Sequence, residues 1–462
     1  MKPVRLWPAE AAKRLWTRLC LNRSSSAVIL CLTLATSAIF KLSAFARESF
    51  IAAKFGISAV TDAYFGLQQF PTTLGTFMFG AFALAFTPAY AAARRRAGGV
   101  EWLPGLLFFG SMVGAALTAL TLLGAPFLLH TLHIAGTRDV WSTLAILSFC
   151  FAPIIWIGIW TGICTAHGRN LRAMIVGGLP YLIMALTLFG LYAVGWLNNL
   201  SLPISLTTGF GLMGIWSVVC VLRSQPLPRH AGSLVLAWRV AEFRSFLRQL
   251  VASSIENGGF AGNQLLMLYF LAQAGTGILS ANNFAMRIGM LGFSLLAQPL
   301  AQLMLARLCS AEEKERPRLF RRWILAILVM VLLCALAILV LRVPVIRVVY
   351  MRGKFQAAEL NTVASLLRAW IGYFVVMSVN AGVARYLFLR HQGRLYVRRQ
   401  LSAYMAANLL RLVIMGATDA PWIIWCSVAT EASALLLNLH TCVAGATPRE
   451  IAPALTTSSE AL

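Results

Sequence analysis

The stretch KLSAFARESFIAAKFGISAVTDAYF, residues 41–65, decides the fold because it places charge directly after a long apolar run. In a soluble protein such charges would lie on the surface and need no further explanation. At the end of a helix that crosses a membrane, each charge costs free energy and usually faces a cavity or a partner. The charged side chains of this stretch are Lys41, Arg47, Glu48, Lys54 and Asp62.

The composition of the whole chain indicates an integral membrane protein. Of its 462 residues, 59% are hydrophobic and only 12% are charged, whereas roughly a quarter of the residues in soluble domains are charged. Apolar runs recur along the chain, each long enough to cross about 30 Å of hydrocarbon as a helix of about 20 residues. Continuous apolar runs, without alternation of polar and apolar residues, favour helices over a barrel.

The apolar runs predict an all-α polytopic protein with about 12 transmembrane helices in two six-helix bundles. The domain boundaries follow: a basic tail (1–25), an N-terminal bundle (26–223), a linker (224–248), a C-terminal bundle (249–445) and a C-terminal tail (446–462). The predicted spans are 26–46, 64–92, 104–130, 141–166, 173–196, 201–222, 249–273, 277–306, 323–346, 361–389, 400–417 and 421–444.

The distribution of basic residues predicts the orientation of the chain. Lys and Arg total 39 against 15 Asp and Glu, and they gather in the N-terminal tail and in every second loop. By the positive-inside rule these segments, the linker and both termini are cytoplasmic. No RNA-binding signature accompanies the charge, so we expect no nucleic-acid partner. The nine cysteines show neither close pairing nor ligand spacing and are interpreted as buried apolar side chains.

Charges within the predicted spans are the candidates for function. Lys41, Arg47 and Arg287 are predicted to line a cavity between the two halves, where Arg and Lys suit the oxygens of a phosphate or diphosphate. A structural alternative is an ion pair between Glu256 and Arg287, and Arg411 is expected to extend from a helix end to water. Supporting cavity or gate residues are predicted to be Asp62, Glu256, Asn257, Asn283, Arg352 and Arg368.

Motifs for catalysis are missing from the sequence. The histidines are scattered, and there is no HExxH pair, no acidic pair at metal spacing, no GxSxG and no GxxxxGK[ST] loop for ATP. We therefore expect a transporter without catalytic residues, metal or cofactor, driven by the membrane potential or by an ion. A membrane-embedded enzyme of glycan assembly remains an alternative, although such enzymes usually have larger outer loops.

The opening stretch, continued to Pro71, resembles the first-helix signature of the MviN/MurJ lipid-linked precursor flippases. The segment GAFALAFTPAY (80–90) is similar to the motif that follows in the family, and FAMRIGMLGFSLLAQPLAQLMLARL (284–308) resembles its eighth segment. VYMRGKFQAAELNTVASLLRAW (349–370) contains a match to the family's R-G-x-F motif. The resemblance implies the fold of the multidrug/oligosaccharidyl-lipid/polysaccharide (MOP) superfamily, V-shaped with a central cavity.

The same resemblance implies a function. The family moves undecaprenyl-diphosphate-linked sugars from the inner to the outer leaflet of the bacterial inner membrane. Lys41 stands where the family has a substrate-site arginine, whereas Arg47, Asp62 and Arg287 match the family residues directly. Expected partners are the lipid-linked glycan, the bilayer and enzymes of glycan assembly.

Departures from the family pattern leave the cargo open between lipid II and an exopolysaccharide repeat unit. TLGTFMFGAF (73–82) is one residue shorter than the family segment and lacks its two arginines and its glutamate. The predicted twelve spans also fall short of the fourteen that are typical of peptidoglycan members. Two further alternatives are a drug or cation exporter of the same superfamily, which would need acidic residues at the cavity centre, and a scaffold without transport activity.

Overall fold

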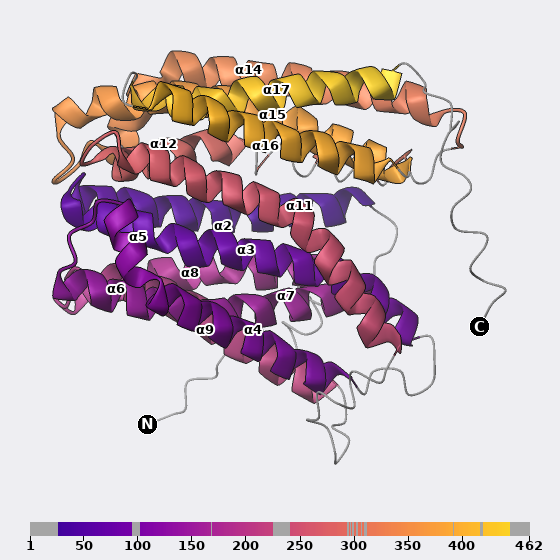
Figure 1. Ribbon diagram of the computed structural model, residues 1–462, viewed down its shortest axis with the longest axis horizontal. Coiled ribbons are helices and arrows are strands. Elements are labelled where there is room, and N and C mark those ends of the chain that lie inside the picture. The colour runs from indigo at the N-terminus through magenta and orange to yellow at the C-terminus, as the bar shows by residue number, and fades with distance from the viewer. Residues whose placement is uncertain are drawn as a thin grey trace, which may run out of the picture.

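The computed structural model describes residues 26–94, 102–167, 169–224, 241–292, 312–390, 392–415 and 419–443, with scattered positions between 293 and 311. All regular secondary structure in these residues is helical. The helices run roughly parallel to one long direction and form two groups side by side, one from the first half of the chain and one from the second (Figure 1). The predicted all-α membrane fold is confirmed.

The N-terminal group contains helices at all six predicted positions, but two of the predicted spans are broken. The span predicted at 104–130 is interrupted at Gly124, where Pro126 in the first turn of α5 has no N–H to continue the helix. The span predicted at 141–166 is interrupted at Phe149 and Cys150. The helices are α2 (Ser26–Phe55), α3 (Ala59–Arg94), α4 (Leu103–Leu123), α5 (Ala125–Thr131), α6 (Arg138–Ser148), α7 (Phe151–Ala166), α8 (Asn170–Ala193) and α9 (Ser201–Ser224).

The C-terminal group also has a helix at each predicted position, and its first helix connects the two groups. This helix, α11, begins at Ala241, so residues 241–248 of the predicted linker are helical. Phe243 and Phe246 of its first turns pack with Phe82 and Trp102 of the N-terminal group, and Figure 1 shows α11 crossing from one group to the other. The helices are α11 (Ala241–Ala272), α12 (Ile278–Gly292), α14 (Arg316–Tyr350), α15 (Ala357–Leu389), α16 (Gly393–Ile414) and α17 (Ala420–Val443).

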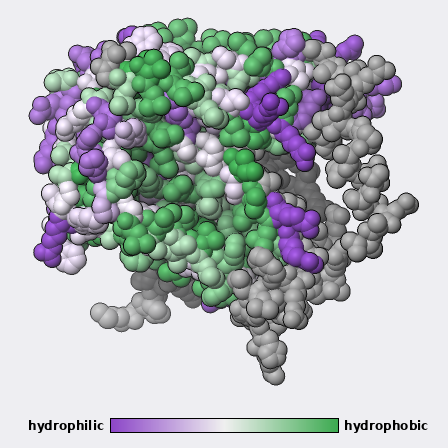
Figure 2. Space-filling view, in the orientation of Figure 1, coloured by the Kyte–Doolittle hydropathy of each residue, from purple (hydrophilic) through white to green (hydrophobic). Residues whose placement is uncertain are grey.

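The surface of the molecule fits a lipid environment. Within the described residues, seven helical segments are long and apolar enough to cross a membrane. Large apolar side chains such as Leu123 and Val413 are strongly exposed, and lipid would cover them. Figure 2 shows apolar residues across the middle of the viewed face and hydrophilic residues gathered at its two ends. The chain is therefore a multi-pass membrane protein.

One end of the molecule carries α5 together with the turns 56–58, 132–137, 194–200, 273–277 and 351–356, and we call it the α5 end. The opposite end carries the described helix ends at Arg94, Arg223, Arg316 and Arg390, which adjoin in sequence the connections expected in the cytoplasm. The relation of these two ends to the buried charges determines what the protein can do.

Inside the C-terminal group, Arg411 is completely buried. Its guanidinium donates hydrogen bonds to the Ile423 carbonyl oxygen at 3.0 Å, to Asn263 Oδ1 at 2.8 Å, to Asn408 Oδ1 at 2.6 Å and to the Ser427 hydroxyl. The expectation that Arg411 extends to water was wrong. Neutral oxygens from three helices satisfy the charge inside the bundle, which makes Arg411 part of the packing of α11, α16 and α17.

Candidate functional site

A cluster of buried polar side chains joins the two halves of the molecule between α2, α3 and α12. Glu48 lies at its centre, with Oε1 3.6 Å from Arg47 Nη1 and 3.6 Å from Arg287 Nε. Asn283 Nδ2 donates to Glu48 Oε2 at 3.1 Å, and the guanidinium of Arg47 donates to the Tyr64 hydroxyl. We call these five residues the buried cluster.

The charges of the buried cluster do not cancel, because two guanidinium groups share one carboxylate. Arg47 exposes 3% of its side chain and Arg287 exposes 31%. Arg47 is enclosed and held by Tyr64 and Glu48, whereas nearly a third of the Arg287 side chain is exposed, although its Nε atom is buried. A net positive charge with one partly exposed guanidinium at the junction of two helix bundles suits an anionic ligand, and a guanidinium can bind two phosphate oxygens at once.

Lys41 does not contact the buried cluster directly. It lies partly exposed on α2, and its ammonium is 5.9 Å from the centre of the Tyr181 ring in α8. Tyr181 also acts electrostatically on Arg47, so this ring lies near both cations. The structure thus brings Arg47 and Arg287 together around Glu48 and places Lys41 beside Tyr181. The predicted role of Lys41 in the cavity stays a prediction.

Glu48 is the functional candidate that sequence reasoning missed. From the sequence, Glu256 was considered as a structural partner of Arg287, and Glu48 was noted only as a charge after the first apolar run. In the structure Arg287 pairs with Glu48 of the first half. The signal was present in the adjacent pair Arg47 and Glu48, since an acidic residue beside a buried cation usually neutralises it inside a membrane.

Among the remaining predicted residues, Asn283 belongs to the buried cluster. Asn257 on α11 lines a cavity of about 200 Å³ between α11, α15 and α16. Arg352, in the turn after α14, and Arg368, on α15, are both exposed. The side chain of Glu256 lies outside the described part of the structure. The roles of these four residues stay predictions.

Asp62 connects the two halves at the α5 end by capping a helix of the other half. Its carboxylate accepts hydrogen bonds from the Ser280 N–H at 2.8 Å, from the Ser280 hydroxyl at 2.5 Å and from the Gly277 N–H. These N–H groups belong to the start of α12, where backbone donors have no partner within the helix and the helix dipole favours an anion. One carboxylate on α3 therefore holds the end of α12.

A second contact at the α5 end joins the turn after α2, which contains Gly56, to the turn after α14, which contains Gly353. The Lys354 N–H donates to the Ala53 carbonyl oxygen at 2.9 Å. Gly353 has φ +64°, and a Cβ placed there would lie 2.0 Å from the same oxygen. A Cβ on Gly56, which has φ +65°, would lie 2.9 Å from the Lys354 carbonyl oxygen. Only glycine fits both positions, and the two halves are closed against each other at this end.

Replacing Asp62 by alanine is expected to open the α5 end. The substitution removes a carboxylate that accepts several hydrogen bonds, each contributing about 1.5–3 kcal/mol. The equilibrium constant for separating α3 from α12 should therefore rise by at least about tenfold. Distances between spin labels at Ser58 and Thr276 should shift to longer values. In the control Asp139→Ala, the lost bond to Asn199 lies within the N-terminal half, and the distances should not change. Unchanged distances in Asp62→Ala would contradict this role.

Replacing Gly353 by alanine is expected to destabilise the protein more than the same change at Gly195. Both glycines have positive φ, and alanine at either position carries a backbone cost of about 1–2 kcal/mol. A Cβ at Gly195 meets nothing within 4 Å, whereas one at Gly353 meets the Ala53 backbone. The midpoint of thermal unfolding should therefore fall further in Gly353→Ala. Equal midpoints of thermal unfolding in Gly353→Ala and Gly195→Ala would show that the contact between the halves contributes nothing to stability.

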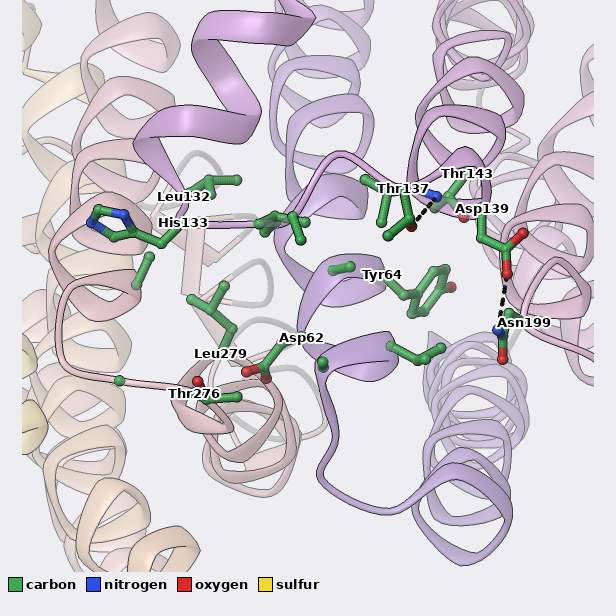
Figure 3. Close-up of a pocket in the computed structure, with 18 of the residues that line it drawn as sticks. Asp62, Tyr64, Leu132, His133, Thr137, Asp139, Thr143, Asn199, Thr276 and Leu279 are labelled. Atoms are coloured by element: carbon green, nitrogen blue, oxygen red, sulfur yellow. Dashed lines mark hydrogen bonds between the residues drawn. The ribbon is translucent and has the colours of Figure 1, made fainter.

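The α5 end also contains the cavity drawn in Figure 3, with a volume of about 720 Å³. Its walls come from both halves: the start of α3, the turn between α5 and α6, Asn199 before α9, and the turn between α11 and α12. Asp62 and Tyr64 line this cavity, and both also take part in the contacts described above. The cavity therefore borders the buried cluster from the α5 end.

Comparison with known proteins shows the family of the chain. A sequence model of the family described as "Lipid II flippase MurJ" matches residues 51–397. A probable lipid II flippase MurJ of Rhizobium tropici is 26% identical over 350 residues, covering 70% of this chain and 63% of the relative. One of Rhizobium meliloti is 24% identical over 351 residues, covering 71% and 64%. The match thus spans less than two thirds of the length of these curated relatives.

Solved structures share the fold. A lipid II flippase MurJ in an inward closed conformation has a TM-score of 0.78 at 15% identity, covering 89% of this chain and 87% of that chain. An inward-facing multidrug resistance MATE family transporter of the MOP superfamily has a TM-score of 0.69 at 13% identity, covering 90% and 98%. The predicted MOP superfamily fold is confirmed. Because the family model matches more than half of the chain, the protein belongs to the lipid II flippase MurJ family, a family of transporters and not of enzymes.

Proposed function

We propose that this protein is a flippase that moves a lipid-linked glycan precursor with a diphosphate from the inner to the outer leaflet of the bacterial inner membrane. The observation that supports it most is the buried cluster, where two arginines share one carboxylate and Arg287 is accessible. The guanidinium of Arg287 binds the diphosphate, with Lys41 as a second cation on the wall formed by α2. The lipid tail stays in the bilayer during transport.

The closed α5 end indicates the direction of transport across the membrane. We assign this end to the outside, because the described helix ends at the opposite end adjoin the basic connections of the sequence, which places both termini in the cytoplasm. With the outer end held by Asp62 and by the contact between Gly353 and Ala53, the head group enters from the cytoplasmic side. Rocking of the two bundles then breaks the outer contacts and exposes the head group outside.

The membrane potential supplies the driving force, and no bound cofactor takes part. Each elementary charge that crosses the membrane is worth about 2.3 kcal/mol per 100 mV. In a cell with a negative interior, an anionic head group is pushed outward. The emptied cationic site is then drawn back toward the inside.

Lipid II is the first candidate cargo, because the two curated relatives are described as probable lipid II flippases. An exopolysaccharide repeat unit is the second, because residues 73–82 lack the charged side chains that the family pattern has there. Both cargoes share the lipid diphosphate that the buried cluster would bind. Enzymes that assemble the glycan would act before and after this step.

A drug or cation exporter fits the site less well. Such a protein would need an acidic group available to a cationic ligand, whereas Glu48 exposes only 1% of its side chain and already lies between Arg47 and Arg287. The likeness to MATE transporters concerns the fold alone.

Flipping by the purified protein in proteoliposomes tests the proposal. Fluorescent lipid II and a fluorescent lipid-linked exopolysaccharide unit are supplied in one leaflet, and their appearance in the other is measured with an impermeant quencher. We expect transport of at least one of these lipids above that of protein-free liposomes, increased by an imposed potential. Rates equal to those of protein-free liposomes for both lipids would contradict the proposed function.

A further inference from the structure

The cavity at the α5 end differs chemically from the buried cluster that it borders. Its volume of about 720 Å³ falls within the range of about 300–1,000 Å³ that is typical of small-molecule sites. No group of like charges lines it. The carboxylate of Asp62 is occupied by α12, and the side chains of Arg138 and Asp139 at the rim carry opposite charges.

The polar groups of this cavity are arranged for hydrogen bonding to a neutral molecule. Asn199 Nδ2 donates to Asp139 Oδ2 at 3.1 Å, which fixes both side chains at one wall (Figure 3). Each of them keeps further donors or acceptors that can face the cavity. His133 and Thr137 add polar groups from the turn between α5 and α6, and the lining also contains the apolar side chains Leu132, Ile134 and Leu279.

Tyr64 connects this cavity with the buried cluster. The ring of Tyr64 lines the cavity, while its hydroxyl accepts a hydrogen bond from Arg47. Leu279, in the first turn of α12, also lines the cavity, and α12 carries Arg287. Along α12, Arg287 lies eight residues beyond Leu279, about 12 Å at 1.5 Å per residue, so a molecule with its anionic part at Arg287 can extend a group of sugar size toward the cavity.

We propose that the cavity at the α5 end is a saccharide-binding site, which holds the sugar part of the lipid-linked glycan as it leaves the transporter. This inference rests on the proposed function for the identity of the ligand. A sugar presents hydroxyl groups to amides and carboxylates and C–H faces to apolar walls, and the cavity offers both. A diphosphate would instead meet Asp139 beside Arg138, with no group of cations among the lining residues, so the anionic part stays with Arg287.

Binding of a soluble disaccharide to the purified full-length protein tests the site without lipid or transport. N,N′-diacetylchitobiose serves as the probe, and saturation-transfer-difference NMR gives its affinity. We expect saturable binding by the native protein and affinity lower by about tenfold or more in Asp139→Ala and in Asn199→Ala, because each removes part of the fixed hydrogen-bonding wall. The control Asn361→Ala, an exposed asparagine on α15, should bind as the native protein does.

A further variant distinguishes loss of the binding site from misfolding of Asp139→Ala and Asn199→Ala. Ala135→Trp adds a large side chain at an exposed position in the wall of the cavity and removes no polar group, so it should also abolish binding. Native protein without saturable binding, or binding unaffected by all three cavity variants, would overturn the saccharide site. Failure to transport lipid-linked glycans would contradict the proposed function alone, because disaccharide binding is measured independently of transport.

Discussion

Replacement of Arg287 by alanine is expected to abolish transport of the lipid-linked glycan while leaving the protein folded in the membrane. The guanidinium is the accessible cation of the buried cluster, with 31% of its side chain exposed. Its removal takes away charge-assisted hydrogen bonds of about 1.5–3 kcal/mol each, so binding of the diphosphate should weaken by at least about tenfold. Flipping in proteoliposomes measures the effect, and size-exclusion chromatography in detergent confirms folding.

Two further variants make the Arg287 result specific. Arg287→Lys keeps the charge but not the planar fork, so it should recover part of the rate. Arg318→Ala removes an exposed arginine from the first turn of α14 and should transport at the native rate. Native-like flipping by Arg287→Ala would contradict the role of the buried cluster in binding.

Replacement of Glu48 by alanine is expected to cause the largest loss of stability. Glu48 is buried between two guanidinium groups, and its removal leaves Arg47 enclosed without its counter-charge. Breaking a buried ion pair by removing one partner typically costs about 3–5 kcal/mol. The midpoint of thermal unfolding should fall strongly, whereas Glu313→Ala at an exposed position before α14 should leave it almost unchanged.

A double variant separates the loss of the carboxylate from a general packing defect. Arg47→Met combined with Glu48→Ala removes the enclosed charge together with its partner, so it should be more stable than Glu48→Ala alone. If the double variant loses the sum of the two single effects, Glu48 acts through packing and not through charge neutralisation.

Much of the fold could be predicted because it depends on local hydrophobicity. Helices occur at all the predicted positions, since an apolar run has few other ways to satisfy its backbone in a membrane. Local breaks were harder to predict, and the interruption before Pro126 was missed because the apolar run continues through it. The early start of α11 was missed because residues 241–248 carry charge, although Phe243 and Phe246 bury their rings on the N-terminal half.

The candidate site was predicted in part. The free-energy cost of placing a charge inside the membrane identified Arg47 and Arg287 as residues that need a cavity or a partner. The structure places both around one carboxylate. That Glu48 is this carboxylate depends on the packing of α2 against α12, which hydrophobic runs do not encode. The capping of α12 by Asp62 was beyond sequence reasoning for the same reason, because its partners Gly277 and Ser280 lie in the other half.

The central claim is that the accessible positive charge of the buried cluster binds the diphosphate of a lipid. Native mass spectrometry of the purified protein with undecaprenyl diphosphate and undecaprenyl monophosphate measures this directly. We predict tighter binding of the diphosphate by the native protein, and loss of this preference in Arg287→Ala. Equal affinity of the native protein for the two lipids, or a preference that survives in Arg287→Ala, would contradict the account.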